Sequence, residues 1–151
     1  MTVADRLAEL GIALPAPAAP LAAYVPAVRT GNLVYTSGQL PVVAGALAAT
    51  GKVGVDVSVA EAAELAGTCA LNALAAVDAL VGLDAVRRVV KVVGFVASAP
   101  GFGGQPEVVN GASELLGQVF GDAGRHARSA VGVAELPRNA PVEVEIIVEV
   151  G

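Results

Sequence analysis

The sequence is poor in the residues that form disulfides, metal sites and aromatic binding surfaces. It contains one cysteine, one histidine, no tryptophan, two tyrosines and three phenylalanines. A single cysteine excludes an internal disulfide, and one histidine with one cysteine is too few for a typical zinc site. The glycine-rich loop Gly101–Gly104, which we interpret as a flexible connection, has neither the dinucleotide-binding spacing nor the Lys-Ser/Thr pair of a phosphate loop. We therefore expect no metal and no cofactor.

Basic residues are also scarce. Nine lysines and arginines stand against fourteen acidic residues, so the formal net charge is -5. The only adjacent basic pair is Arg87-Arg88. Nucleic-acid binding depends on clustered cations for the phosphates and on aromatic rings for the bases. The composition therefore makes general nucleic-acid binding an unfavourable interpretation.

Long hydrophobic runs are missing. The longest apolar segment, residues 65–81, is interrupted by glycine, threonine, asparagine and aspartate, whereas a membrane-spanning helix needs about 20 mostly apolar residues. The N-terminal stretch MTVADRLAELGIALP lacks the basic-then-apolar layout of a signal peptide. We expect no membrane association and a cytoplasmic location.

Small and branched aliphatic residues are abundant instead. Hydrophobic residues make up 55% of the 151 residues and charged residues only 15%. The length is typical of one domain, which we expect to span residues 1–151, and it suffices for a core without covalent staples. The apolar excess reflects either a composition bias or a second apolar surface buried between subunits, since obligate interfaces resemble a domain core. We favour an oligomer.

Two long helices are predicted. The first begins at Ser58-Val-Ala-Glu61, which has the form of a capping box, and ends at Gly82. The second begins near Pro106, because proline suits the first helical turn, and ends at Gly121. Apolar residues recur at helical spacing in both segments. Each helix should therefore bury one face and expose the other.

Strands are predicted from a turn signal and from alternation. The dipeptide Gly31-Asn32 separates two extended segments and indicates a hairpin. In the last segment valine and isoleucine alternate with glutamate, as in a strand with one apolar face. The predicted strands span residues 25–30, 33–37, 86–96, 127–133 and 142–150.

The order of these elements is hairpin, helix, strand, helix, strand, strand. A short helix over residues 3–10 and an extended proline-rich arm over residues 14–20 precede them. This order predicts an α+β fold in which two main helices pack on one face of a mixed sheet. The other face should meet water or another subunit.

Strand parity singles out Arg128. In the strand 127–133 it shares a face with Ala130 and Gly132, whose small size leaves room around a guanidinium. A guanidinium can hold a carboxylate through two parallel hydrogen bonds. The same pattern fits a structural ion pair on the surface, so parity alone leaves both interpretations open.

Four further residues are candidates for the site. Glu143 opens the polar face of the last strand, where it is either a solvated glutamate or a carboxylate that orients or deprotonates a water. His126 should lie on the same face as Arg128, but its role is undetermined. Asn110 is either solvated or part of a site. Cys69 lies in an apolar helical stripe, so core packing is favoured over a nucleophilic role.

Three stretches of the chain resemble the RidA/YjgF family, also called the L-PSP endoribonuclease family. The most specific is the arginine, short strand and Leu-Pro of Arg128–Pro137, followed by the Val-Glu-x-Glu strand at Val142–Glu145. The second runs from Tyr24 to the segment Val34–Gln39, and the third is Asn110 in its helix.

The resemblance, which covers roughly residues 14–150, implies a chorismate-mutase-like fold assembled as a homotrimer, with ligand clefts between subunits. Members of the family typically hydrolyse reactive imine or enamine intermediates to a 2-oxo acid and ammonia. By matching motif, the resemblance implies that Arg128 holds the substrate carboxylate and that Glu143 positions a water. It implies three further cleft residues: Tyr24, Ser37 and Asn110.

The sequence also departs from the family pattern. Val25 stands after Tyr24 where the family has serine, and Ala130 stands where a cysteine is common. The segment Val109–Leu116 resembles a divergent branch whose substrate is not settled. Besides deaminase activity, three alternatives therefore stay open: a non-catalytic trimer that binds a small carboxylate, RNA cleavage, and a mutase activity suggested by fold alone.

Overall fold

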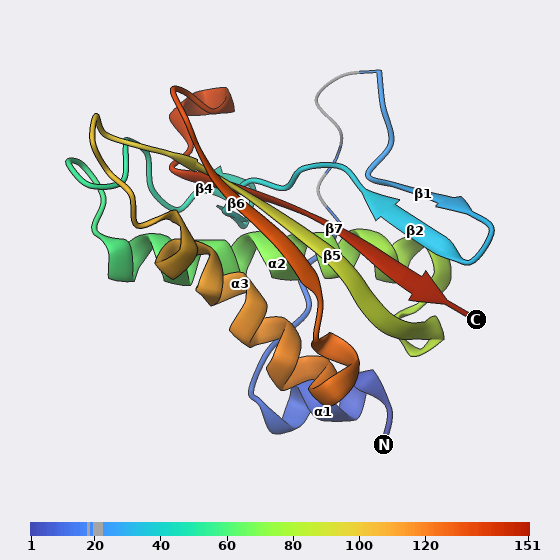
Figure 1. Cartoon of the computed structure of the whole chain (residues 1–151). Coiled ribbons are helices and arrows are strands. Elements are labelled where there is room, and N and C mark those ends of the chain that lie inside the picture. Colours follow the sequence, from blue (N-terminus) through green and yellow to red (C-terminus); the bar gives the residue numbers. More distant parts are fainter. Residues whose placement is uncertain (18, 20–22) are drawn as a thin grey trace.

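A five-stranded sheet lies at the centre of the computed structural model, which describes residues 1–17, 19 and 23–151 (Figure 1). Its strand order is β1-β2-β7-β5-β6, and all neighbours are antiparallel except β5 and β6. The mixed sheet agrees with the prediction. The strands are β1 (Ala27–Thr30), β2 (Leu33–Thr36), β5 (Val86–Ala97), β6 (Ala127–Val133) and β7 (Val142–Val150).

The two long helices cover one face of this sheet, as predicted, and a short N-terminal helix contacts the second of them (Figure 1). Three single turns of 3-10 helix complete the chain. The long helices are α2 (Val59–Val81) and α3 (Gln105–Phe120), the short one is α1 (Val3–Glu9), and the 3-10 turns are η1 (Leu83–Ala85), η2 (Gly121–Gly124) and η3 (Pro137–Asn139). Of the predicted arm, residues 18 and 20 lie outside the described residues, and the rest has no regular secondary structure.

The helix boundaries follow from local chemistry. The Ser58 side chain accepts a hydrogen bond from the backbone N–H of Glu61, which satisfies one of the free amides at the start of α2. Gly82 (φ 79°) ends α2 and Gly121 (φ 62°) ends α3, in backbone conformations that favour glycine. The predicted start of α2 and the two glycine stop signals are therefore confirmed, but of the predicted capping box only the Ser58 bond is formed among the described residues.

The apolar side of β7 packs on α2 and forms the middle of the core. Val142, Val144, Ile146, Val148 and Val150 are all buried, whereas the residues between them are half-buried. Helix α2 is long and apolar enough to cross a membrane, but 56% of its most apolar window is buried inside the protein. Its hydrophobicity is therefore explained by packing in the protein core.

Two features were not predicted. A two-residue hairpin, β3 (Val42–Val43) and β4 (Ala46–Leu47), turns through residues of positive φ and is too short to give a periodic pattern. Asn72, which interrupts the apolar stripe of α2, is buried and holds this region. Its side-chain amide donates to the carbonyls of Leu40 (3.0 Å) and Val42 (3.1 Å).

The loop that we interpreted as a flexible connection is anchored by one aromatic side chain. Phe102 packs against the core, and its ring lies over Gly54 and Gly104, where a Cβ would come within 3.0 Å and 2.8 Å of ring atoms. The side chain of Gln105 also donates to the Phe102 carbonyl at 2.9 Å. The glycines thus provide space for a ring.

The two long helices approach each other most closely at a glycine. A Cβ on Gly111 of α3 would collide with the backbone carbonyl of Ala63 in α2. Gly117, in the same helix, has nothing within 4 Å of the corresponding position. Alanine substitutions at Gly111 and Gly117 therefore separate the effect of helix contact from the effect of helix propensity.

We expect Gly111→Ala to lower the free energy of unfolding by about 2 kcal/mol or more, because the backbones of α2 and α3 must move apart. Gly117→Ala should instead raise it by about 0.5–1 kcal/mol, since alanine is the better helix former. Urea denaturation of the two variants beside the wild-type protein tests this. Equal effects of the two substitutions would contradict the close helix contact.

Candidate functional site

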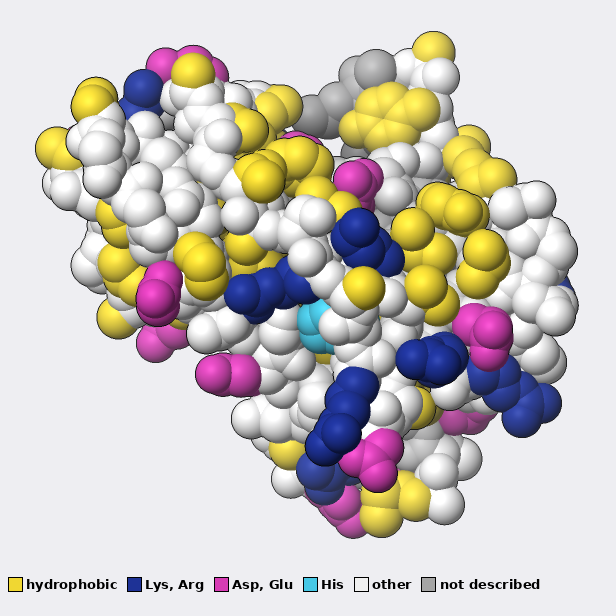
Figure 2. Space-filling model, viewed as in Figure 1, with side chains coloured by type: hydrophobic (Ala, Val, Ile, Leu, Met, Phe, Trp, Pro, Cys, Tyr) yellow, Lys and Arg dark blue, Asp and Glu magenta, His cyan; other side chains and the backbone are white. Residues whose placement is uncertain are grey.

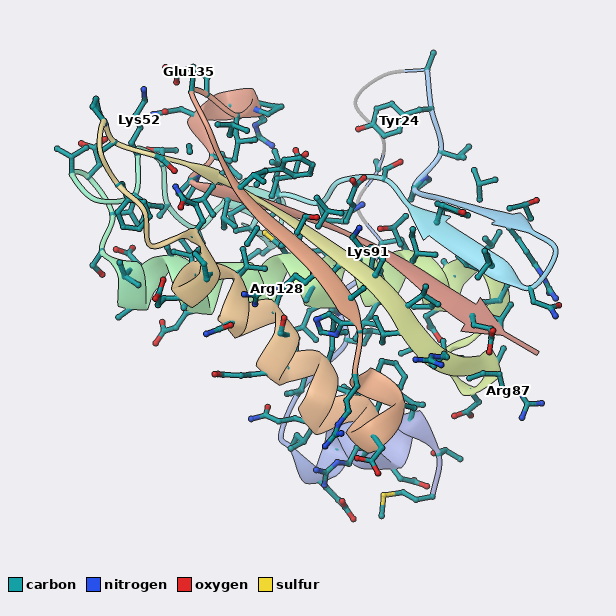
Figure 3. The ribbon with its side chains drawn as sticks, in the orientation of Figure 1. Tyr24, Lys52, Arg87, Lys91, Arg128 and Glu135 are labelled. Atoms are coloured by element: carbon teal, nitrogen blue, oxygen red, sulfur yellow. The ribbon has the colours of Figure 1, made fainter. Side chains whose placement is uncertain are left out.

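Arg128 lies on the edge strand β6 and points to α3 (Figure 3). Its Nη1 donates to Asn110 Oδ1 at 2.8 Å and to Ser113 Oγ at 3.3 Å. Its Nη2 donates to the carbonyl oxygen of Pro106 at 3.3 Å. The half-buried guanidinium is thus held by three acceptors of one helix, and Asn110 lies beside it.

The acceptors around Arg128 are all neutral. A guanidinium has five N–H donors, so the Nε hydrogen and one Nη2 hydrogen have no partner in the described part of the chain. The ion pairs formed by described residues do not include Arg128. The structural ion pair that the sequence left open is therefore not made, and the positive charge is fixed but not compensated.

The single histidine belongs to the same cluster, and histidine reaches the surface among basic side chains in Figure 2. His126 Nε2 lies 2.9 Å from Ser113 Oγ, the atom that Arg128 also contacts. His126 Nδ1 lies 2.7 Å from the carbonyl oxygen of Gly124 in η2. The prediction that His126 faces the same side as Arg128 is confirmed, but Ser113 was missed because a helix serine gives no signal in the sequence.

Glu143 lies on the open face of the sheet, opposite the helices, where it is paired with Phe95 of β5. Burial of the side chain, with a smaller contribution from the charge of Glu145, raises the pKa of Glu143 above its ordinary value. Gly38 makes room for this carboxylate, since a Cβ there would lie 2.5 Å from Glu143 Oε2. The carboxylate is therefore closely packed against the backbone.

A single chain does not bring Arg128 and Glu143 together. Arg128 pairs with Val92, which pairs with Ile146, and both partners are buried under the helices. Glu143 projects from the opposite face of the same sheet. The two residues that the family resemblance combines in one cleft thus lie on different faces.

Tyr24 lies on the β2 side of the molecule, away from Arg128 (Figure 3). Ser37 directly follows β2, which β7 and β5 separate from the strand of Arg128. The Tyr24 side chain is half-exposed. Ser37 Oγ donates to the Val25 carbonyl at 2.6 Å, and Ser37 N donates to the Pro26 carbonyl at 2.8 Å. Ser37 therefore fixes the segment that follows Tyr24.

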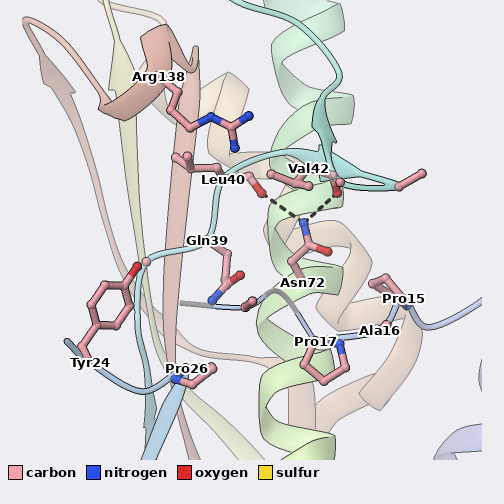
Figure 4. A pocket seen from close by; sticks show the side chains of 14 residues that line it. Pro15, Ala16, Pro17, Tyr24, Pro26, Gln39, Leu40, Val42, Asn72 and Arg138 are labelled. Carbon is pink, nitrogen blue, oxygen red and sulfur yellow. Dashed lines mark hydrogen bonds between the residues drawn. The ribbon is translucent and has the colours of Figure 1, made fainter. Parts of the chain in front are cut away.

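Tyr24 borders a cavity of about 440 Å³ between the N-terminal arm, the segment after β2, and α2 (Figure 4). Most of its walls are apolar, and its polar groups include three that the sequence did not suggest. Arg138, at φ 59°, is the only cation among the described residues that line it, and Gln39 and Asn72 are buried amides. Its other lining residues are Pro15, Ala16, Pro17, Ala19, Pro26, Gly38, Leu40, Val42, Ala44 and Gly45.

Cys69 is fully buried, and its Sγ lies 3.8 Å from the Val142 carbonyl oxygen. Burial raises the pKa of the Cys69 thiol well above its ordinary value, so the reactive thiolate is disfavoured. The predicted core role is confirmed. No cluster of three metal-ligating side chains occurs among the described residues.

Residues 15–150 match the family described as endoribonuclease L-PSP. The chain belongs to the RidA/YjgF family. Protein TCP17 of Trypanosoma cruzi is 49% identical over 97% of this chain and 93% of its own length. A RutC family protein of Haemophilus influenzae is 38% identical over 87% of this chain and 89% of its own.

Solved structures of the family share the fold. The Agrobacterium tumefaciens protein Atu1372, of unknown function, is 52% identical with a TM-score of 0.92, over 99% of this chain and 92% of its own. A candidate endoribonuclease from Shewanella oneidensis is 32% identical with a TM-score of 0.96, over 99% and 100%. YjgF of Escherichia coli is 33% identical with a TM-score of 0.65, over 89% and 92%.

We expect Glu143→Gln to raise the free energy of unfolding at pH 7–8. The folded state binds the Glu143 proton more tightly than the unfolded chain, because the pKa of Glu143 is raised on folding. The stability linked to this proton is therefore fully present below the unfolded-state pKa and is lost as pH rises through the folded-state pKa. The neutral amide carries no such loss, so the variant should gain over wild type as pH rises.

Denaturant unfolding at several pH values from 4 to 8 measures this difference. Glu114→Gln, exposed in the middle of α3, is the matched control for a general change of charge. A stability difference for Glu143→Gln that does not depend on pH would contradict the raised pKa.

Proposed function

We propose that the protein hydrolyses small 2-imino acids, or their enamine tautomers, to 2-oxo acids and ammonia. The observation that carries the proposal is the fixed, uncompensated guanidinium of Arg128. Its free Nε and Nη2 hydrogens suit a carboxylate, which binds an arginine fork through two parallel bonds. Asn110, Ser113 and Pro106 contribute geometry without neutralising the charge.

Glu143 is the proposed group that orients the attacking water. Burial raises the pKa of Glu143 in the direction of neutral pH. A carboxyl group whose pKa lies nearer the working pH can both accept and return a proton. Water adds its oxygen to the C=N carbon and one proton to the nitrogen, which gives a carbinolamine. The remaining hydroxyl proton then passes to the amine as the C–N bond breaks, so that the C=O bond of the 2-oxo acid forms and ammonia leaves. An imine is already electrophilic, so modest positioning suffices.

A homotrimer is part of the same proposal, because Arg128 and Glu143 can share a cleft only if they come from different chains. Figure 2 looks onto the strands and shows hydrophobic side chains gathered along them. Val28, Tyr35 and Val131, on the open face, are 52%, 43% and 43% exposed. An exposed apolar sheet face of this kind is typical of a subunit interface.

A solved relative supports the ligand class. Escherichia coli TdcF, 27% identical with a TM-score of 0.59 over 90% of this chain and 94% of its own, is described with bound serine. Serine is a small molecule with a free carboxylate, as are 2-imino acids. The proposed ligand of this chain therefore belongs to the same chemical class.

We expect Arg128→Ala to lower kcat/KM for 2-iminobutanoate by about 100-fold, because the substrate carboxylate loses two charge-assisted hydrogen bonds. The imine is generated in the assay, and its decay is followed by trapping with semicarbazide. Arg125→Ala is the matched control, since Arg125 lies three residues away and is largely exposed.

A wild-type protein that leaves the spontaneous hydrolysis of the imine unchanged would contradict deaminase activity. The same preparation is assayed with RNA, because several relatives carry an endoribonuclease label. Calorimetry measures the binding of 2-oxobutanoate to the wild-type protein and to Arg128→Ala. Binding that Arg128→Ala abolishes, without turnover of the imine, would identify a non-catalytic carboxylate-binding protein.

The proposed trimer predicts that Val131→Glu shifts the protein from the mass of three chains to that of one. The substitution places a charge on the open sheet face, where the interface would have to bury it. Val55→Glu is the control, because Val55 is 71% exposed in a loop outside the sheet. Sedimentation velocity measures both variants, and an assembly that Val131→Glu does not disturb would place the interface elsewhere.

A further inference from the structure

A continuous chain of hydrogen-bonding atoms runs behind Arg128. It begins at the Gly124 carbonyl in η2, passes through both ring nitrogens of His126 and the Ser113 hydroxyl on α3, and ends at Arg128 Nη1 on β6. The separations are 2.7, 2.9 and 3.3 Å. Three elements of the fold therefore meet at one guanidinium.

The chemistry of the atoms fixes the direction of every hydrogen bond in the neutral chain. A carbonyl oxygen only accepts, so His126 Nδ1 must carry the hydrogen that it shares with Gly124. In neutral imidazole Nε2 is then a bare acceptor. Ser113 must donate its hydroxyl hydrogen to Nε2, which leaves the lone pairs of Ser113 Oγ for Arg128 Nη1.

We propose that Ser113 and His126 are positioning residues that orient the Arg128 guanidinium for a carboxylate ligand, an inference that rests on the proposed function. His126, in its Nδ1–H tautomer, holds the Ser113 hydroxyl so that its lone pairs face Nη1. Ser113 and Asn110 together take both Nη1 hydrogens. The guanidinium plane is fixed, and the Nε hydrogen and one Nη2 hydrogen have no partner among the described residues.

Fixing the guanidinium before the ligand binds reduces the conformational entropy that an arginine side chain loses on binding. That side chain carries about 2 kcal/mol of rotamer entropy, which binding must otherwise overcome. Asn110 is exposed to competing water, whereas Ser113 and His126 are both partly buried. The partly buried pair is therefore the better device for holding the plane.

The competing explanation is that the pair only packs α3 against the start of β6. That role predicts a loss of stability without a change in ligand affinity. A positioning role predicts weaker binding of 2-oxobutanoate in a variant that is still folded, and a higher KM with little change in kcat. Stability alone changes under the packing explanation, whereas ligand affinity and KM change under the positioning explanation.

Because His126 is the only histidine, nitrogen NMR of the imidazole gives one unambiguous pair of signals. We expect a protonated Nδ1 and an unprotonated Nε2 at a pH where the ring is neutral. A neutral ring that carries its hydrogen on Nε2 would overturn the proposed chain of hydrogen bonds. This readout needs neither a ligand nor enzymatic activity.

Variants then test the effect on Arg128. Ser113→Ala and His126→Phe should each weaken 2-oxobutanoate binding by about 5- to 10-fold, the effect of losing one ordinary hydrogen bond in the chain that orients the guanidinium. His126→Gln, which keeps an acceptor near the position of Nε2, should recover much of the affinity. Glu114→Ala, on the exposed side of the same turn of α3, is the control.

The Arg128 Nη signals report the same effect without ligand. They should be resolved in the wild-type protein, where the guanidinium is held, and averaged by rotation in Ser113→Ala. Unchanged affinity and unchanged Nη signals in folded Ser113→Ala would overturn the inference. A wild-type protein that binds 2-oxobutanoate but does not hydrolyse the imine would count against the deaminase proposal alone.

Discussion

The burial of one sheet face under α2 and α3 is the constraint on which the rest of the structure depends. The apolar residues of β7 must face the helices, so Glu143 and Glu145 must face the other way. Through the pairing of β7 with β5 and of β5 with β6, the same constraint turns Arg128 toward α3. The separation of the two candidate catalytic residues is therefore a consequence of core packing.

Much of this arrangement could be predicted from the sequence, because it depends on periodicity. The alternation of β7 and the set of residues that share a face with Arg128 follow from a period of two residues. What escaped prediction depends on exceptions to that period. Tyr35 pairs with Ile147 but Gln39 pairs with Val144, so one extra residue on the β2 side reverses the direction of Gln39 and carries it into the cavity.

Two solved relatives that are equally similar in sequence differ in how closely their structures match this chain. The Shewanella protein and YjgF are equally similar in sequence, at 32% and 33% identity, but their TM-scores are 0.96 and 0.65. The former covers 99% of this chain, and the family match begins only at residue 15, after α1. The cavity is walled in part by the arm that follows α1. Similarity of fold therefore does not establish the substrate of this chain.

Charge gives the last argument for a shared cleft. Arg128 has no carboxylate partner among the described residues. Burial, with a smaller contribution from the neighbouring Glu145, raises the pKa of Glu143 and so disfavours its ionisation. Each arrangement costs stability in a single chain, because a half-buried charge without an opposite charge is poorly solvated. In the proposed trimer the cation of one chain and the acids of the next meet across the ligand. In that cleft the unpaired charge of Arg128 would bind the carboxylate of the ligand, and Glu143 of the next chain would hold the water. The charges that destabilise a single chain would then be complementary to the ligand.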